Sequence, residues 1–263
     1  MDVDSRPDVG GLLLDLDGTL YLGDEAIPGA VETVRALRAS GLPCRFLTNT
    51  TRRSRADLAA WLGNLGFAID EDDVFTAAVS AARWLQSEGV ERVALYLAES
   101  TFADFADFDV TDEGPDAIVV GDLGDRWDFA TLNGAFRQLL GGARLVALQR
   151  NRYWRTERGL ELDAGPFVAA LEYAADTEAV VVGKPSEAFF GMGARSLGVE
   201  PERIVVVGDD VETDVAGAMD AGMTGILVRT GKHTEERLEA SGVRPHAILD
   251  SIADLPRFLE GRQ

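Results

Sequence analysis

The chain has 263 residues, of which 46% are hydrophobic and 27% are charged, as is usual for a globular protein. Its 45 Asp and Glu against 25 Lys and Arg give a formal charge of −20, which argues against a nucleic-acid partner, because phosphates are bound through cationic contacts. No apolar run is long enough to span a membrane and no signal-peptide pattern precedes the first strand, so we expect a cytoplasmic protein without a membrane partner. The single cysteine, Cys44, allows no intrachain disulfide and fits the same compartment.

The cationic residues are almost all arginine, since Lys184 and Lys232 are the two lysines of the chain. An acidic, lysine-poor surface suits a salt-rich cytosol, where screening relieves the repulsion between like charges. A GC-rich genome, which favours Arg codons, would produce the same bias. Both interpretations stay open, and a stability curve in KCl separates them.

The N-terminal part alternates strand and helix patterns. The apolar run 12–14 ends at Asp15, as expected of a strand buried on both faces. Apolar residues at near-helical spacing predict helices over 30–40 and within 54–66. Between these helices, residues 44–47 are a second strand candidate.

The middle of the chain, residues 76–179, has the pattern of a second α/β unit. No Pro- or Ser-rich linker separates it from the rest, so we expect a domain that is inserted through short connections. Its strand candidates are 93–97, 117–120 and 145–148, and its helix candidates are 129–140 and 166–175.

The C-terminal part returns to the first pattern. Alternating strands and helices predict a parallel sheet that is covered on both faces. The expected fold is therefore α/β, with a Rossmann-like three-layer core formed by residues 1–75 and 180–263 and an inserted α/β domain formed by residues 76–179. The strand candidates of this part are 180–182, 204–207, 226–228 and 247–249, and its helices are expected over 185–197 and from residue 211.

Polar residues directly follow four of the strands that we assign to the core. In an open parallel sheet, ligands bind beyond the carboxyl ends of the strands. We therefore expect these side chains to meet at one edge of the sheet. They are Asp15 and Asp17, Thr48 and Asn49, Lys184, and Asp209 with Asp210.

The residue types at this edge suit phosphoryl chemistry. Asp15, Asp17 and Asp209 would bring three carboxylates together, and like charges repel unless a cation or a proton intervenes. Oxygen ligands select a hard ion, which favours Mg²⁺, whereas the two histidines of the chain are too few and too poorly placed for zinc. A metal beside a lysine and a threonine hydroxyl can hold a phosphoryl group, and a carboxylate can attack its phosphorus.

The same residues resemble the four ordered motifs of the haloacid dehalogenase superfamily. A unit inserted between the second and third motifs resembles the cap of the NagD-like branch, subfamily IIA. Residues 151–154, 165–168 and 170–174 are also similar to two animal members of this branch. The motifs are Asp15-Leu-Asp17-Gly-Thr19, Thr48-Asn49, Gly183-Lys184-Pro185, and Gly208-Asp209-Asp210 through Thr213-Asp214.

The resemblance implies a Mg²⁺-dependent phosphatase that acts on small phosphorylated metabolites. Asp15 is then the nucleophile and a metal ligand. Asp17 protonates the leaving oxygen, later activates water, and lends its backbone carbonyl to the metal. Thr48 and Asn49 bind the transferring phosphoryl group.

The remaining motif residues receive roles from the same resemblance. Lys184 offsets the charge between the nucleophile and the phosphoryl group, and Asp209 binds Mg²⁺ directly. Asp214 orients the water shell of the metal, although Asp210 competes with it for this role. A homodimer is compatible with the sequence.

Other functions on the same scaffold are weighed against a phosphomonoester hydrolase. A dehalogenase needs neither an acid at position 17 nor a metal, so Asp17 and Asp209 argue against it. A non-enzymatic binding module would be plausible had a catalytic position been lost, and none has. The alternatives that stay open are hydrolysis of pyrophosphate or of a phosphoamide, which the resemblance to one family member implies, and phosphoryl transfer to a second acceptor.

Three further features are interpreted as structural. Residues 119–122 imitate the fourth motif but lie in the inserted unit, where we expect a strand end and a turn. His233 follows Gly231-Lys232, which lacks the upstream glycine of a Walker P-loop, and we expect a surface loop with a solvated histidine. Cys44 lies in an apolar segment and is expected to be a packed thiol.

Overall fold

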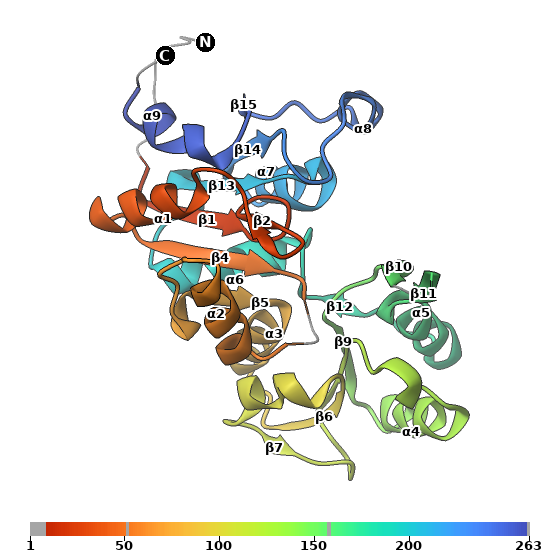
Figure 1. The fold of residues 1–263 in the computed structure, drawn as a ribbon. Helices are drawn as coiled ribbons and strands as arrows, with labels where there is room; N and C mark the ends of the chain where they lie inside the picture. Colours follow the sequence, from red (N-terminus) through yellow and green to blue (C-terminus); the bar gives the residue numbers. More distant parts are fainter. Residues whose placement is uncertain (1–8, 51–52, 157–158, 262–263) are drawn as a thin grey trace. The chain divides into compact units, whose positions relative to one another are not determined.

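A computed structural model describes residues 9–50, 53–156 and 159–261 of the chain (Figure 1). The described residues form two compact units, which we call the core unit and the cap unit. The core unit comprises the described parts of Met1–Thr48, Arg55–Phe75 and Phe189–Gln263. The cap unit comprises those of Asn49–Ser54 and Thr76–Ala188.

The core unit is built on a six-stranded sheet with the order β15-β14-β13-β1-β4-β5. β1 pairs in parallel with β13 on one side and with β4 on the other. From β1 the chain extends the sheet to β5, then returns to β13 on the opposite side, so the strand order reverses between β1 and β13. The strands are β1 (Gly11–Asp15), β4 (Cys44–Thr48), β5 (Val74–Thr76), β13 (Ile204–Gly208), β14 (Thr224–Val228) and β15 (Ala247–Leu249).

Helices of the core unit pack on an apolar sheet. Every residue of β1 and of β13 is buried, which explains why both strands are unbroken apolar runs. Because side chains alternate along a strand, Leu12 and Leu14 share a cluster with the first two helices, whereas Leu13 lies against Gly193 of α6. The helices are α1 (Ala30–Ala39), α2 (Arg55–Asn64), α6 (Glu187–Leu197), α7 (Gly217–Asp220), α8 (Glu235–Ser241) and α9 (Leu255–Leu259).

Short elements complete the core unit. A hairpin of β2 (Tyr21–Leu22) and β3 (Glu25–Ala26) follows the first strand. A π-helical turn, η5 (Val211–Ala216), follows β13 and leads into α7. Single 3₁₀ turns are formed by η1 (Glu71–Asp73), η4 (Pro201–Arg203) and η6 (Ile252–Asp254).

The cap unit has its own sheet, with the order β12-β9-β8-β6-β7 and parallel pairing throughout. An antiparallel hairpin of β10 and β11 is separate from it. The strands are β6 (Arg92–Tyr96), β7 (Asp109–Val110), β8 (Ala117–Val120), β9 (Arg144–Ala147), β10 (Tyr153–Thr156), β11 (Gly159–Leu162) and β12 (Val180–Val181). The helices are α3 (Ala77–Ser87), α4 (Phe129–Leu140) and α5 (Ala164–Ala175), with 3₁₀ turns η2 (Glu99–Phe105) and η3 (Gly124–Arg126).

Side-chain caps start the cap helices where the sequence changes from loop to helix. Thr76 accepts a hydrogen bond from the amide of Val79, and Asp128 accepts one from the amide of Thr131 at 2.7 Å. Apolar side chains of the cap sheet belong to two clusters, with Val119 in one and Ile118 in the other. The cap sheet is therefore buried on both faces, like the core sheet.

The two parallel sheets confirm the α/β fold that the sequence predicts. One strand was placed in the wrong sheet: residues 180–182 were expected in the core, but β12 pairs with β9 of the cap. Apolar character predicts a buried strand but not its partner, which explains the error. The residue boundaries 1–75, 76–179 and 180–263 otherwise stay a prediction. Among the helices of the described ranges, none is both long and apolar enough to cross a membrane.

Candidate active site

Asp15 is the last residue of β1 and lies at the carboxyl edge of the core sheet. It is 5% exposed, and its register partner on β4 is Leu47. The hydroxyl of Thr19, one turn later, donates to Oδ2 of Asp15 at 3.2 Å. This places a buried carboxylate beside the position where the strand order reverses, which is the usual ligand site of an open α/β sheet.

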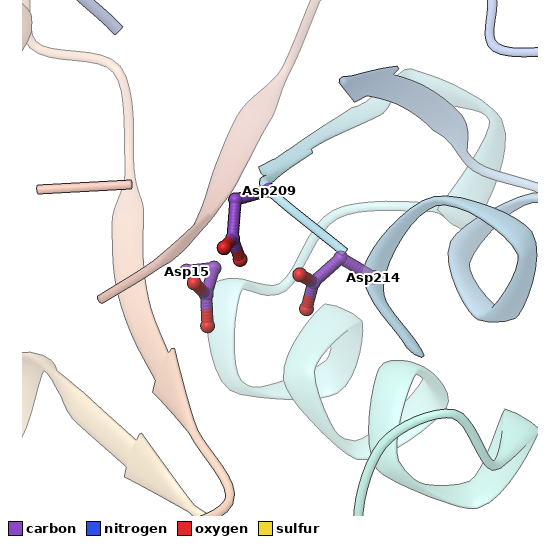
Figure 2. Close-up of side chains that lie close together, drawn as sticks. All are labelled: Asp15, Asp209 and Asp214. Atoms are coloured by element: carbon purple, nitrogen blue, oxygen red, sulfur yellow. The ribbon is translucent and has the colours of Figure 1, made fainter. Parts of the chain in front are cut away.

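Asp209 follows β13, the neighbour of β1, and Asp214 comes from the helical turn η5. Oxygen atoms of Asp15, Asp209 and Asp214 all lie within 4.8 Å of one another, and all three residues are buried. Figure 2 shows the three carboxylates converging from these separate elements. Two strand ends and one helical turn thus form a compact oxygen-ligand cluster.

The turn after β13 orients Asp214. The Asp210 amide donates to Oδ2 of Asp214 at 3.1 Å, and Oδ1 of Asp210 accepts from the amides of Glu212 and Thr213 at 3.1 and 3.2 Å. A Cβ on Gly208 would lie 2.4 Å from the Asp214 side chain, so glycine is required for this approach. The side chain of Asp210 caps the turn, and that of Asp214 joins the cluster.

Asp210 is held by charges as well as by amides. Its carboxylate lies 3.4 Å from Arg237 and 3.8 Å from the Lys232 ammonium. Burial alone would raise the pKa of Asp210, but the Thr213 amide, these two cations and the Glu212 amide together lower it. The structure therefore gives Asp210 and Asp214 different surroundings, which the sequence could not distinguish.

Two more predicted site residues lie in the core unit. Asp17 is exposed and forms an isolated bridge with Tyr21, two residues beyond β1. Thr48 is buried at the end of β4, the strand beside β1. The carboxylate cluster of the described residues contains Asp214 where the sequence had suggested Asp17.

Asn49 and Lys184 belong to the cap unit and contact each other there. Nδ2 of Asn49 donates to the carbonyl oxygen of Lys184 at 3.0 Å, and Oδ1 accepts from the Lys184 amide at 2.9 Å. Glycine is required at position 183, because an added Cβ would lie 2.0 Å from the carbonyl oxygen of Leu148 and 3.1 Å from Oδ1 of Asn49. The Asn49 side chain thus pairs with the backbone of Lys184 as a neighbouring strand would.

Comparison with known proteins identifies the family. Two family profiles match, haloacid dehalogenase-like hydrolase over residues 12–110 and HAD-hydrolase-like over residues 181–255. Haloacid dehalogenase-like hydrolase domain-containing protein 2 of Homo sapiens is 44% identical over 241 residues, which cover 92% of each chain. The chain belongs to the haloacid dehalogenase superfamily.

Other similar proteins place the chain among NagD-like members of this superfamily. Phospholysine phosphohistidine inorganic pyrophosphate phosphatase of Homo sapiens is 37% identical over 252 residues, with 94% of this chain and 92% of that one covered. NagD from E. coli K-12 superposes with a TM-score of 0.85 at 26% identity, covering 94% and 98% of the chains. The p-nitrophenyl phosphatase from Archaeoglobus fulgidus superposes with a TM-score of 0.87 at 29% identity, covering 97% and 100%.

These findings confirm the resemblance drawn from the motifs, and with it a hydrolase of a phosphatase family. The site also fits the metal that such phosphatases use. Three buried carboxylates within 4.8 Å would repel one another strongly without a cation. An oxygen-only donor set suits a hard divalent ion.

The sequence motifs did not identify Thr230–Lys232, the segment after β14 that contacts the carboxylate cluster of this NagD-like protein through Asp209. The amide of Lys232 donates to Oδ2 of Asp209 at 2.6 Å, and the hydroxyl of Thr230 donates to the carbonyl oxygen of Gly18 at 2.5 Å. The signal was available, because Thr230–Lys232 follows a core strand just as the recognised motifs do. Gly231-Lys232 belongs to none of the four motifs and lacks the upstream glycine of a P-loop, so motif recognition does not find it.

The prediction for His233 in the same segment is wrong. Its side chain is 7% exposed, with Nε2 3.5 Å from Glu235, rather than solvated. The His233 amide donates to the carbonyl oxygen of Thr230 at 3.3 Å, in a turn whose residues Gly231 and Lys232 are exposed, so the expected surface loop is present and only the solvated side chain is wrong. By contrast, Asp122 accepts from the Gly124 amide at 2.9 Å, which confirms a strand end and a turn at residues 119–122.

Proposed function

We propose that this protein is a Mg²⁺-dependent phosphatase that hydrolyses small phosphate monoesters through an aspartyl-phosphate on Asp15. The observation that carries the proposal is the buried cluster of Asp15, Asp209 and Asp214 at the point where the core strand order reverses. A chain of a phosphatase family with this cluster has both a carboxylate nucleophile and a cation site.

Asp15 and Asp17 divide the chemistry between a buried and an exposed carboxylate. Asp15 is buried and held through Thr19, so it is fixed for attack on phosphorus. Asp17 is exposed two residues later, where its carboxyl group is free to meet a leaving oxygen and then a water molecule. In the proposed reaction Asp17 gives its proton to the departing alcohol, and the resulting carboxylate takes one from the water that hydrolyses the aspartyl-phosphate.

Asp15, Asp209 and the Asp17 carbonyl would hold Mg²⁺, which would supply positive charge to neutralise the phosphoryl oxygens. Asp214 lies in the carboxylate cluster, so we assign to it, rather than to Asp210, the orientation of the water shell of the metal. Asp210 keeps its cap and its ion pair with Arg237.

Thr48, Asn49 and Lys184 complete the proposal. Thr48 offers a hydroxyl at the end of the strand beside β1, and Lys184 offers a cation for the transferring phosphoryl group. The resemblance to the superfamily motifs implies that Asn49 binds the phosphoryl group. Its two hydrogen bonds to the Lys184 backbone support an added role, which is to fix the backbone that carries that cation.

A second candidate activity is hydrolysis of pyrophosphate or of a phosphoamide. It is favoured by the phospholysine phosphohistidine inorganic pyrophosphate phosphatase, which is 37% identical over 94% of this chain. The same nucleophile serves both reactions, and they differ in the leaving group. Steady-state rates with p-nitrophenyl phosphate, a panel of alkyl phosphates, pyrophosphate and a phosphoamide would rank the two.

The mechanism is tested by hydrolysis of p-nitrophenyl phosphate with Mg²⁺ and with EDTA, in the wild type and in Asp15→Asn. We expect turnover in the wild type with Mg²⁺ alone, and rapid-quench experiments with ³²P-labelled substrate should trap a labelled acyl-phosphate. Activity that survives both EDTA and Asp15→Asn would refute the proposal. A wild-type enzyme that turns over without a labelled intermediate would refute the covalent step.

The acid role of Asp17 is tested by the leaving group. p-Nitrophenolate leaves without much help from an acid, whereas an alkoxide needs a proton. We therefore expect Asp17→Asn to slow formation of the phosphoenzyme far more with an alkyl phosphate than with p-nitrophenyl phosphate. Equal slowing of both substrates would contradict the assignment.

A further inference from the structure

The segment after β14 holds one oxygen of Asp209. The backbone amide of Lys232 donates to Oδ2 of Asp209 at 2.6 Å, a short hydrogen bond as expected with a charged acceptor. The Thr230 hydroxyl donates to the carbonyl oxygen of Gly18 at 2.5 Å. The segment Thr230–Lys232 therefore joins the loop after β1 to the residue that follows β13.

Two glycines enclose the same oxygen. A Cβ on Gly18 would lie 2.1 Å from Oδ2 of Asp209, and one on Gly231 would lie 2.0 Å from it. Both glycines have positive φ, 86° and 60°, which other L-residues adopt at a cost. Oδ2 of Asp209 thus lies close against the backbones of both glycines, with the Lys232 amide donating to it.

Side chains anchor the segment from its outer face. The guanidinium of Arg237 donates to the carbonyl oxygen of Lys232 at 3.3 Å and also lies 3.4 Å from Asp210. The Lys232 ammonium lies 3.8 Å from Asp210. Lys232 is therefore tied to Asp209 by its amide, to Asp210 by its charge and to Arg237 by its carbonyl.

We infer that Thr230, Gly231 and Lys232 are positioning residues for the metal-binding carboxylate of Asp209. By binding Oδ2 between two glycines, the segment fixes the rotation of the carboxylate, so that Oδ1 is presented to the cation. A ligand that is already fixed loses less entropy when the metal binds, so the segment raises metal affinity. The inference rests on the proposed function, because it assumes that Asp209 is a metal ligand.

Gly231→Ala is the decisive variant. Its Cβ would lie 2.0 Å from Oδ2 of Asp209 and 2.6 Å from the Cα of Gly18, so the segment can no longer hold the carboxylate as it does now. We expect the dissociation constant of Mg²⁺, measured by calorimetry on the enzyme without substrate, to rise about tenfold or more, as is typical when an outer partner of a metal ligand is lost. Part of the lost p-nitrophenyl phosphate hydrolysis should return at saturating Mg²⁺.

A matched control separates this contact from backbone strain. Gly242 has a φ of 66°, close to that of Gly231, but an added Cβ there meets no described atom within 4 Å. Gly242→Ala should keep the wild-type Mg²⁺ affinity. Thr230→Val, which removes the hydroxyl donor without changing the shape, should weaken Mg²⁺ by a few-fold and serves as the test variant if Gly231→Ala does not fold.

The outcomes distinguish this inference from the proposed function. A wild-type Mg²⁺ dissociation constant in folded Gly231→Ala, or in Thr230→Val where the first variant does not fold, would overturn the positioning role. The phosphatase mechanism would then still stand if Asp15→Asn is inactive and Asp209→Asn loses Mg²⁺ binding. If Asp209→Asn binds Mg²⁺ like the wild type, the metal site itself is wrong, and the inference fails with it.

Discussion

Asp214→Asn should make the protein more stable without metal and less stable with it. The change keeps the size of the side chain, and the amide oxygen can still accept from the Asp210 backbone at the position now 3.1 Å away. What it removes is one of three buried charges that lie within 4.8 Å of one another. The two conditions therefore report repulsion and metal binding separately.

The magnitude follows from the spacing of the charges. Two like charges 4.8 Å apart, the largest separation that the cluster allows, repel by about 3 kcal/mol at an effective dielectric constant of about 20, and Asp214 takes part in two such pairs. Like charges that share a site relieve part of this repulsion by binding a proton, so the substitution recovers only part of the sum. We expect a gain in unfolding free energy of about 1–3 kcal/mol in EDTA, which corresponds to a few degrees in Tm.

Mg²⁺ should reverse this order. A ligand at 100 times its dissociation constant stabilises the wild type by about 2.7 kcal/mol, whereas a variant with a damaged site gains much less. Differential scanning fluorimetry in EDTA and across a Mg²⁺ series gives both quantities in one experiment. The curves of Tm against Mg²⁺ for wild type and Asp214→Asn should cross.

Asp210→Asn is the matched control, because it is the same change in a buried aspartate of the same turn. Asp210 lies beside Arg237 and Lys232, so its charge is stabilised rather than repelled. The control should lose stability in EDTA and keep most of its gain in Tm with Mg²⁺, because Asp210 lies outside the carboxylate cluster and contacts the Thr230–Lys232 segment only through the Lys232 ammonium. The reasoning is refuted if Asp214→Asn is less stable than wild type in EDTA, or if it keeps the full Mg²⁺ response.

Four other expectations follow from single features of the chain. Asn49→Ala removes both hydrogen bonds to the Lys184 backbone and should lower kcat about tenfold. Asn49→Asp keeps only the hydrogen-bond acceptor, so its kcat should lie between those of Asn49→Ala and the wild type. An unchanged kcat in both variants would contradict the role of Asn49 in positioning Lys184. The hydrogen bond from the Thr131 amide lowers the pKa of Asp128, so the stabilisation by the Asp128 carboxylate should be present above about pH 4 and lost as the pH falls through the lowered pKa. Asp128→Asn keeps the helix cap but does not titrate, so the difference in unfolding free energy between wild type and this variant should shrink over the same pH range in chemical denaturation. A difference that stays constant with pH would contradict the linkage. Burial raises the pKa of Cys44 to about 11. At pH 8, iodoacetamide should therefore alkylate Cys44 of the folded protein on the order of 100-fold more slowly than the same thiol in denaturant. Equal alkylation rates would contradict a packed thiol. If the charge of −20 reflects salt adaptation, unfolding free energy should rise between low and molar KCl, and a flat curve would leave codon bias as its explanation.

Much of the fold could be predicted from the sequence because most of its elements have a clear apolar pattern. α4 runs over Phe129–Leu140 and β15 over Ala247–Leu249, as the apolar spacing predicts. The two-residue strand β12 shows the limit of this reasoning. Its residues read as a buried strand, but pairing depends on which sheet offers a free edge, and the pattern of a single segment contains no such information.

The candidate site divides in the same way. Asp15 and Asp209 could be located because Asp15 ends one apolar strand and Asp209 directly follows another, and strand ends share an edge. Asp210 and Asp214 could not be separated, because the choice depends on a π-helical turn in which one carboxylate caps the amides and the other turns toward the cluster. Side-chain direction within a single turn is a property of local hydrogen bonding rather than of spacing.

Thr230–Lys232 shows a limit of motif recognition at the strand ends. The four motifs do not include Gly231-Lys232, although β14 is adjacent to β13 in the sheet. A neighbouring strand end at the point of reversal must deliver its loop close to the same edge, whatever its sequence resembles. Three adjacent strands, β1, β13 and β14, therefore each supply part of the carboxylate site: Asp15, which we propose as the nucleophile, Asp209, which we propose as a metal ligand, and the Lys232 amide that donates to Asp209.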